Sequence, residues 1–157
     1  MLQIGDYIEV SDLIELAGVK NAYGTQCGII VNKKSNLTII KPKLPTKKRP
    51  TDYPNEWDPK ITGLLHFCGT NKGQTSKQTI QNLNSNLNKH VNEGIFPIYV
   101  YVCYPNNTYR YMGEFVRVPQ YDEWVELDGK KIISFGLISK NINETERIIT
   151  EMIDVYW

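Results

Sequence analysis

The stretch that most constrains the fold of this chain spans residues 64–115. A short apolar run at 64–68 predicts a buried strand, and a glycine-containing turn at 69–73 follows it. Residues 75–92 then predict an amphipathic helix, because apolar side chains recur at spacings of three and four: Ile80, Leu83, Leu87 and Val91. Two more strands, at 96–104 and 108–118, flank a Pro-Asn-Asn turn. The helix is the one segment suited to a long crossover, so most neighbouring strands must pair antiparallel.

The rest of the chain predicts short strands and terminal helices. Residues 4–10 alternate as a strand, and Ser11 is a candidate N-cap for a helix that ends at Gly18. Residues 27–31 and 37–40 predict one hairpin, and residues 124–127 and 132–137 predict another around Asp128-Gly129. A final amphipathic helix starts near Asn143. The expected fold is α+β, with a curved, mostly antiparallel sheet or open β-barrel and two or three flanking helices.

Length and composition indicate one domain over residues 1–157. With 157 residues and 41% hydrophobic content, the chain can bury a single core without a disulfide or metal. It is either a complete domain or a fragment or subunit of a larger system. The scattered Cys27, Cys68 and Cys103 indicate free thiols in a reducing compartment, and no apolar run approaches the roughly 20 residues of a membrane span. We therefore expect a cytoplasmic protein that has no membrane partner and binds no metal or other cofactor.

Positive charge is concentrated in residues 32–50, although the net charge is only +1. This segment holds no acidic residue and carries Lys33, Lys34, Lys41, Lys43, Lys47, Lys48 and Arg49. One interpretation is a solvated lysine-rich loop, and the other is a surface that contacts phosphates. For the second interpretation, the candidate DNA-backbone contacts are Lys41, Lys43, Lys47, Lys48, Arg49 and Lys72. Lys72 lies in the 69–73 turn, which lacks the Gly-Lys-Ser/Thr ending of a nucleotide-binding loop.

Candidate catalytic groups are sparse. Asp122, Glu123, Glu126 and Asp128 surround a predicted hairpin, where solvated surface charges explain them. His66 and Cys68 share one face of a strand, which favours a core position over a nucleophile and its base. We therefore expect no catalytic residue. A metal-dependent nuclease that uses the acidic hairpin is the enzymatic alternative.

Five segments in order resemble the SRA-like (YDG-like, within the PUA-like superfamily) DNA-reading domains of modification-dependent restriction endonucleases. They are Tyr23-Gly24-Thr25-Gln26-Cys27-Gly28-Ile29, Tyr53-x-Asn55-x-Trp57, the run from Leu64 to Gly73, Asn84-x-Asn86-Leu87 and Tyr111-x-Gly113-x-Phe115. Asn55 stands where the family often has Asp. The resemblance implies a module that binds double-stranded DNA and flips a modified base, with a nuclease or helicase in another domain or subunit.

A pocket for a flipped base needs aromatic faces that stack on the base and polar groups that hydrogen-bond to its edge. On this basis the candidate base-pocket residues are Tyr23, Thr25, Gln26, Tyr53, Trp57, Asp58 and Phe67. The structural alternative places Tyr23, Trp57 and Phe67 in the core and makes Thr25 and Gln26 part of a simple turn. The runner-up function is a PUA-like module that binds RNA or a small ligand, since the same aromatic pocket would suit a single-stranded base.

Overall fold

The computed structural model describes residues 2–18, 29–32, 34, 37–44, 55–68, 97–106, 108–127 and 130–156. The predicted helix at 75–92, the 69–73 turn and most of the Tyr23–Ile29 motif lie outside the described residues. The same holds for the proposed Asp128-Gly129 turn.

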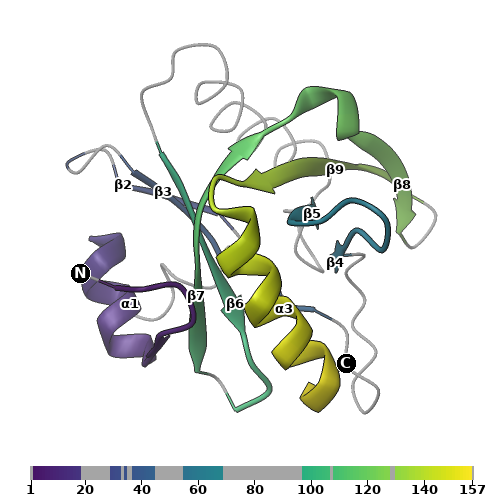
Figure 1. Cartoon of the computed structure of the whole chain (residues 1–157). Coiled ribbons are helices and arrows are strands. Elements are labelled where there is room, and N and C mark those ends of the chain that lie inside the picture. Colours follow the sequence, from purple (N-terminus) through teal and green to yellow (C-terminus); the bar gives the residue numbers. More distant parts are fainter. Residues whose placement is uncertain are drawn as a thin grey trace.

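The described residues form one mixed sheet of nine strands with the order β2-β3-β6-β7-β9-β5-β4 (Figure 1). Off this path, β1 pairs with β7 and β8 pairs with β9. All pairs are antiparallel except β3 with β6. The strands are β1 (Tyr7–Ile8), β2 (Ile29–Asn32), β3 (Leu37–Ile40), β4 (Glu56–Trp57), β5 (Leu64–Cys68), β6 (Ile98–Cys103), β7 (Tyr109–Arg117), β8 (Glu123–Leu127) and β9 (Lys130–Ser139). The predicted fold class, α+β with a mostly antiparallel sheet, is confirmed.

The predicted hairpins form as expected. β2 pairs with β3, β6 pairs with β7 and β8 pairs with β9. A register shift between Val100 and Tyr101 interrupts the β6–β7 ladder, which is the mark of a β-bulge and bends the sheet locally. Strand β5 has the bounds that its apolar run predicted.

The N-terminal segment differs from its prediction. Strand β1 covers two residues, Tyr7–Ile8, and helix α1 already begins at Val10 and runs to Ala17. The N-cap is Glu9, not Ser11: a capping box joins Glu9 to Asp12, whose carboxylate accepts the Glu9 N–H at 3.2 Å. A reciprocal pair of bonds therefore replaces the single hydroxyl cap that we expected. Gly18 ends α1 with φ +68°, as predicted.

Two helices cover opposite faces of the sheet. Helix α3 (Ile142–Tyr156) crosses in front of β6 and β7, and α1 lies to the side of β7 (Figure 1). Ile148, Ile149 and Met152 of α3 pack into one core cluster with Phe67 and Phe115, whereas Leu13 and Ala17 of α1 belong to a second. A 3-10 turn, η2 (Pro119–Tyr121), joins β7 to β8. Neither of the helices in the described ranges is long and apolar enough to cross a membrane.

Candidate nucleic-acid interface

A buried asparagine joins the two ends of the sheet order. The Asn55 side-chain Nδ2 donates to the Lys43 carbonyl at 3.2 Å, and its Oδ1 accepts the Cys68 N–H at 2.7 Å. Asn55 is 3% exposed. Lys43 follows β3 near one end of the order, and β4 is the last strand at the other end. One amide side chain therefore connects the lysine-containing segment to the β4–β5 hairpin.

Lys41 and Lys43 lie on a segment that is fixed to the sheet. The backbone of Lys43 forms an isolated parallel bridge with Cys103, whose N–H donates to the Pro42 carbonyl at 3.0 Å. The Lys41 ammonium lies 5.8 Å from the centre of the Tyr109 ring, within the range of a cation–π contact. Lys43 itself is exposed. The backbone of the Lys41–Lys43 segment is thus held in place while the Lys43 side chain faces solvent.

Trp57 lies on β4, beside this segment. Its indole is half-buried and packs against Phe115, with ring centres 6.2 Å apart. The buried Nε1 has no hydrogen-bond partner. A buried N–H without an acceptor costs free energy, so Trp57 carries an unused donor.

Both carboxylate oxygens of Asp58 are used within the protein. Oδ1 accepts the N–H groups of Lys60 and Ile61, each at 2.7 Å, and Oδ2 lies 2.7 Å from His66 Nε2. The hydrogen bond with His66 is the main reason that the pKa of Asp58 is lowered, and the Ile61 N–H adds to the effect. The charged carboxylate therefore fixes the turn that joins β4 to β5.

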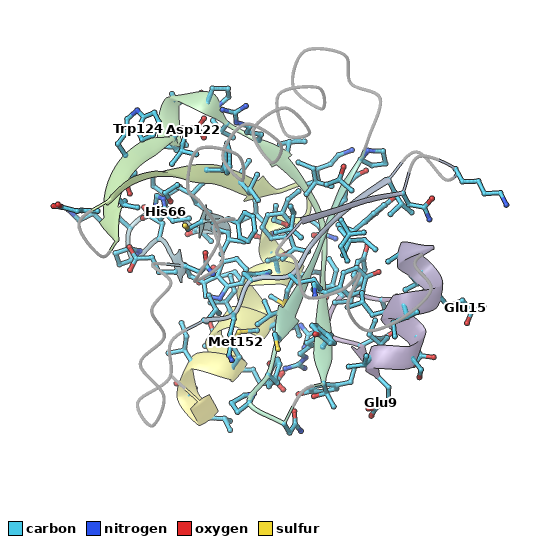
Figure 2. All side chains as sticks on the ribbon, turned by 180° about the vertical axis from the view of Figure 1, so that it is seen from behind. Glu9, Glu15, His66, Asp122, Trp124 and Met152 are labelled. Atoms are coloured by element: carbon cyan, nitrogen blue, oxygen red, sulfur yellow. The ribbon has the colours of Figure 1, made fainter. Side chains whose placement is uncertain are left out.

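His66 has a second ionisable neighbour. Its Nδ1 is buried without a hydrogen-bond partner and lies 3.8 Å from Glu123 Oε1. Figure 2 shows His66 on the same side of the molecule as Asp122 and Trp124. The imidazole thus stands between the β4–β5 hairpin and strand β8.

Phe67 occupies the core. It is 1% exposed and belongs to the same cluster as Phe115 and Phe135. This position agrees with the core interpretation of Phe67, and a base would have to displace packed side chains to reach its ring.

The other predicted site residues lie outside the described residues: Tyr23, Thr25, Gln26, Tyr53, Lys47, Lys48, Arg49 and Lys72. Their roles stay predictions. Of the described candidates, Lys43 is bound through its backbone carbonyl to Asn55, which precedes Trp57 by two residues and Asp58 by three. The role of Asn55 was missed because its two partners are 12 and 13 residues away.

The acidic hairpin is not uniformly solvated. Glu123 and Glu126 are exposed, as expected, but Asp122 is not. Its Oδ2 accepts from Arg117 Nε at 3.1 Å and also contacts Arg117 Nη2, while its Oδ1 accepts the Gly136 N–H at 2.9 Å. The expectation of a solvated Asp122 is wrong, because a cation and a backbone donor hold it at the β7–β8 corner. In the described part of the chain, no three His, Cys, Asp or Glu side chains are grouped to hold a metal ion.

The comparisons with known proteins bear on the fold. No family model matches the sequence, and no curated protein matches it. Among solved structures, the chain is similar to the DNA modification-dependent restriction endonuclease AspBHI, with a TM-score of 0.53 and 15% identity over 86% of this chain. It is also similar to the SRA domain of SUVH5, solved in complex with fully methylated CG DNA, with a TM-score of 0.53 and 17% identity over 89% of this chain.

These similarities show that the chain has an SRA-like fold. The match covers 90% of the SUVH5 SRA chain but 41% of the AspBHI chain. The present chain therefore corresponds to nearly all of an SRA domain and to less than half of the AspBHI chain.

Proposed function

We propose that this chain is a DNA-binding domain that recognises modified duplex DNA, most simply a modified cytosine, and serves a modification-dependent restriction system. The fold supports this proposal, because one structural neighbour is an SRA domain with methylated DNA and the other is a modification-dependent endonuclease. In this proposal the chain supplies recognition, and cleavage belongs to another domain or subunit.

The observation that carries the proposal is the junction of the basic segment with the Trp57 hairpin. Lys43 projects to solvent from a segment that Asn55 ties to the strand start next to Trp57. Lysines in this position attract phosphates without reading sequence, and an adjacent aromatic group supplies the sequence-independent stacking that an extruded base needs. Charge and stacking surface thus lie on two segments that share one hydrogen-bonded junction.

Trp57 is the described residue best suited to contact the base. Extruding a base costs a few kcal/mol, and stacking on an aromatic side chain returns roughly 1 to 3 kcal/mol per base. Asp58 then forms part of the pocket wall, because its carboxylate already holds the turn and His66.

A binding panel tests the proposal. Duplexes that carry methyl, hydroxymethyl or glucosylated cytosine, or a phosphorothioate linkage, are compared with an unmodified duplex of the same sequence. We expect the duplex with one of these base modifications to bind at least about tenfold more tightly than the unmodified duplex. Trp57→Ala should weaken binding to that modified duplex by about 5- to 150-fold. Trp124→Ala is the matched control, because Trp124 is 63% exposed on β8 and is not part of the junction.

One further outcome would redirect the proposal, and one control is needed. Competition by single-stranded RNA that exceeds competition by modified duplex would favour the PUA-like alternative. Trp57→Ala also removes a packing partner of Phe115, so its melting temperature is measured, and Trp57→Phe serves as the milder variant.

A further inference from the structure

Asn55 has hydrogen-bond partners that no other common side chain of its size would satisfy together. It donates to a carbonyl, at Lys43, and accepts from an N–H, at Cys68. A carboxylate has no proton to donate, and leucine, although similar in size, can neither donate nor accept. Because Asn55 is 3% exposed, a lost partner would not be replaced freely by water.

The same side chain joins three segments that lead into the candidate site. Lys43 precedes the part of the chain that carries Lys47, Lys48 and Arg49, and Asn55 itself directly precedes β4 and Trp57. Cys68 ends β5, immediately before the residue 69–73 motif. The Asn55–Lys43 bond therefore holds residues 43 and 55 together. Holding two segments in place before binding lowers the conformational entropy that must be lost when they bind a ligand.

The anchoring is reinforced on both sides of Asn55. Leu44, the residue after Lys43, is 5% exposed and packs in the cluster that contains Leu65 and Phe67. On the other side, Trp57 pairs with Leu65 in the β4–β5 ladder. Asn55 is thus the polar link between two segments that the apolar core already places near each other.

We propose that Asn55 is a positioning residue for DNA recognition, which sets the placement of the Lys41–Lys43 segment relative to Trp57. This inference rests on the proposed function. It assigns Asn55 an indirect role: its amide is occupied by the backbone, so it acts through the two segments and does not read the base. Selectivity for modified DNA should need this placement, whereas weak binding to any duplex, which depends on positive charge, should not.

The test measures the ratio of dissociation constants for unmodified and modified duplex in wild type, Asn55→Asp and Asn55→Ser. Asn55→Asp keeps the size but removes the donor, and Asn55→Ser shortens the side chain so that it cannot bridge both partners, without adding charge. Asn143→Asp controls for the added charge at an exposed position. Ile149→Val controls for stability alone, because it removes one methylene from the core, and Ile149 is 3% exposed.

We expect both Asn55 variants to lower the selectivity ratio by about tenfold, which corresponds to loss of one buried hydrogen bond, while affinity for unmodified DNA stays within about threefold. The two controls should keep the wild-type ratio. If Asn55→Asp does not fold, Asn55→Ser decides the question. Wild-type selectivity in the Asn55 variants would overturn the positioning role alone, whereas a wild-type protein without selectivity would overturn the proposed function itself.

Discussion

His66 Nε2 and Asp58 Oδ2 lie 2.7 Å apart and link strand β5 to the turn that precedes it. Asp58 also accepts two backbone N–H groups from that turn, so a single carboxylate organises the whole β4–β5 connection. Trp57 is the neighbouring residue. The residue after Trp57 therefore fixes the turn that follows β4 through its hydrogen bonds.

Asp58→Asn should destabilise the protein in a pH-dependent way. The folded-state pKa of Asp58 lies below its ordinary value of 3.8, first because of the His66 hydrogen bond. A lowered pKa means that the carboxylate stabilises the folded state above the ordinary value, and that this contribution is lost as the pH falls through the folded pKa. We expect a loss of about 1 to 3 kcal/mol at pH 7, which shrinks below pH 3.8.

Urea unfolding of wild type and Asp58→Asn across this pH range measures the effect. Asp154→Asn, at an exposed position on α3, is the control. A stability difference that stays constant down to strongly acid pH would contradict the role given to the Asp58 carboxylate.

Asp122→Ala should lower the free energy of unfolding by about 3 kcal/mol, because it removes a carboxylate that pairs with the largely buried Arg117 guanidinium. Arg117 also lies over the Phe135 ring, 4.9 Å from its centre, so its position affects the core. Glu126→Ala on the same hairpin should change stability by less than about 0.5 kcal/mol, since Glu126 is exposed. Equal effects of the two substitutions in chemical denaturation would show that Asp122 is an ordinary surface charge.

Gly136→Ala should destabilise the β7–β8 corner. A Cβ at Gly136 would lie 2.5 Å from the Tyr121 Cβ and 3.1 Å from the Val118 carbonyl oxygen, which leaves no room without a shift of the η2 backbone. Overpacking of this kind costs about 1 to 3 kcal/mol. Thermal unfolding measures the cost, and a melting temperature equal to that of wild type would mean that η2 moves aside freely.

The double substitution Lys41→Gln with Lys43→Gln should reduce the salt dependence of DNA binding. Each lost phosphate contact lowers the slope of log affinity against log salt by about 0.9, so the pair should lower it by up to about 1.8. Lys140→Gln with Arg147→Gln removes the same charge from exposed positions at and before α3 and should leave the slope close to that of wild type. A slope that falls equally in both double variants would mean that net charge alone, not the Lys41–Lys43 segment, drives binding.

Much of the fold follows from local pattern. Strand β5, the β6–β7 hairpin and helix α3 were predictable because apolar periodicity and turn residues act within a few positions of each other. Strand β4 was not, since two residues, Glu56 and Trp57, are too few to show alternation. The N-cap at Glu9 was missed because Ser11 is the more usual type of cap residue, whereas Glu9 acts as a cap only through its capping box with Asp12.

The site was less predictable than the fold. Residue types indicated that Trp57, Lys41 and Lys43 could contact DNA, and the structure adds a hydrogen bond between the Lys43 carbonyl and Asn55, two residues before Trp57. The pairings Asp58–His66 and Asn55–Lys43 could not be read from the sequence, because they depend on which strands become neighbours in space. The motif Tyr53-x-Asn55-x-Trp57 was the one available signal for Asn55, and it did not indicate that the amide would be turned inward.

The proposed function requires the chain to distinguish modified from unmodified duplex DNA. The measurement that tests this is a competition titration at about 0.15 M salt. A labelled modified duplex is displaced either by the same duplex without label or by an unlabelled, unmodified duplex of the same sequence. We expect the modified competitor to be effective at a concentration at least about tenfold lower than the unmodified one. Equal competition by the two duplexes across the whole modification panel would rule out recognition of modified DNA.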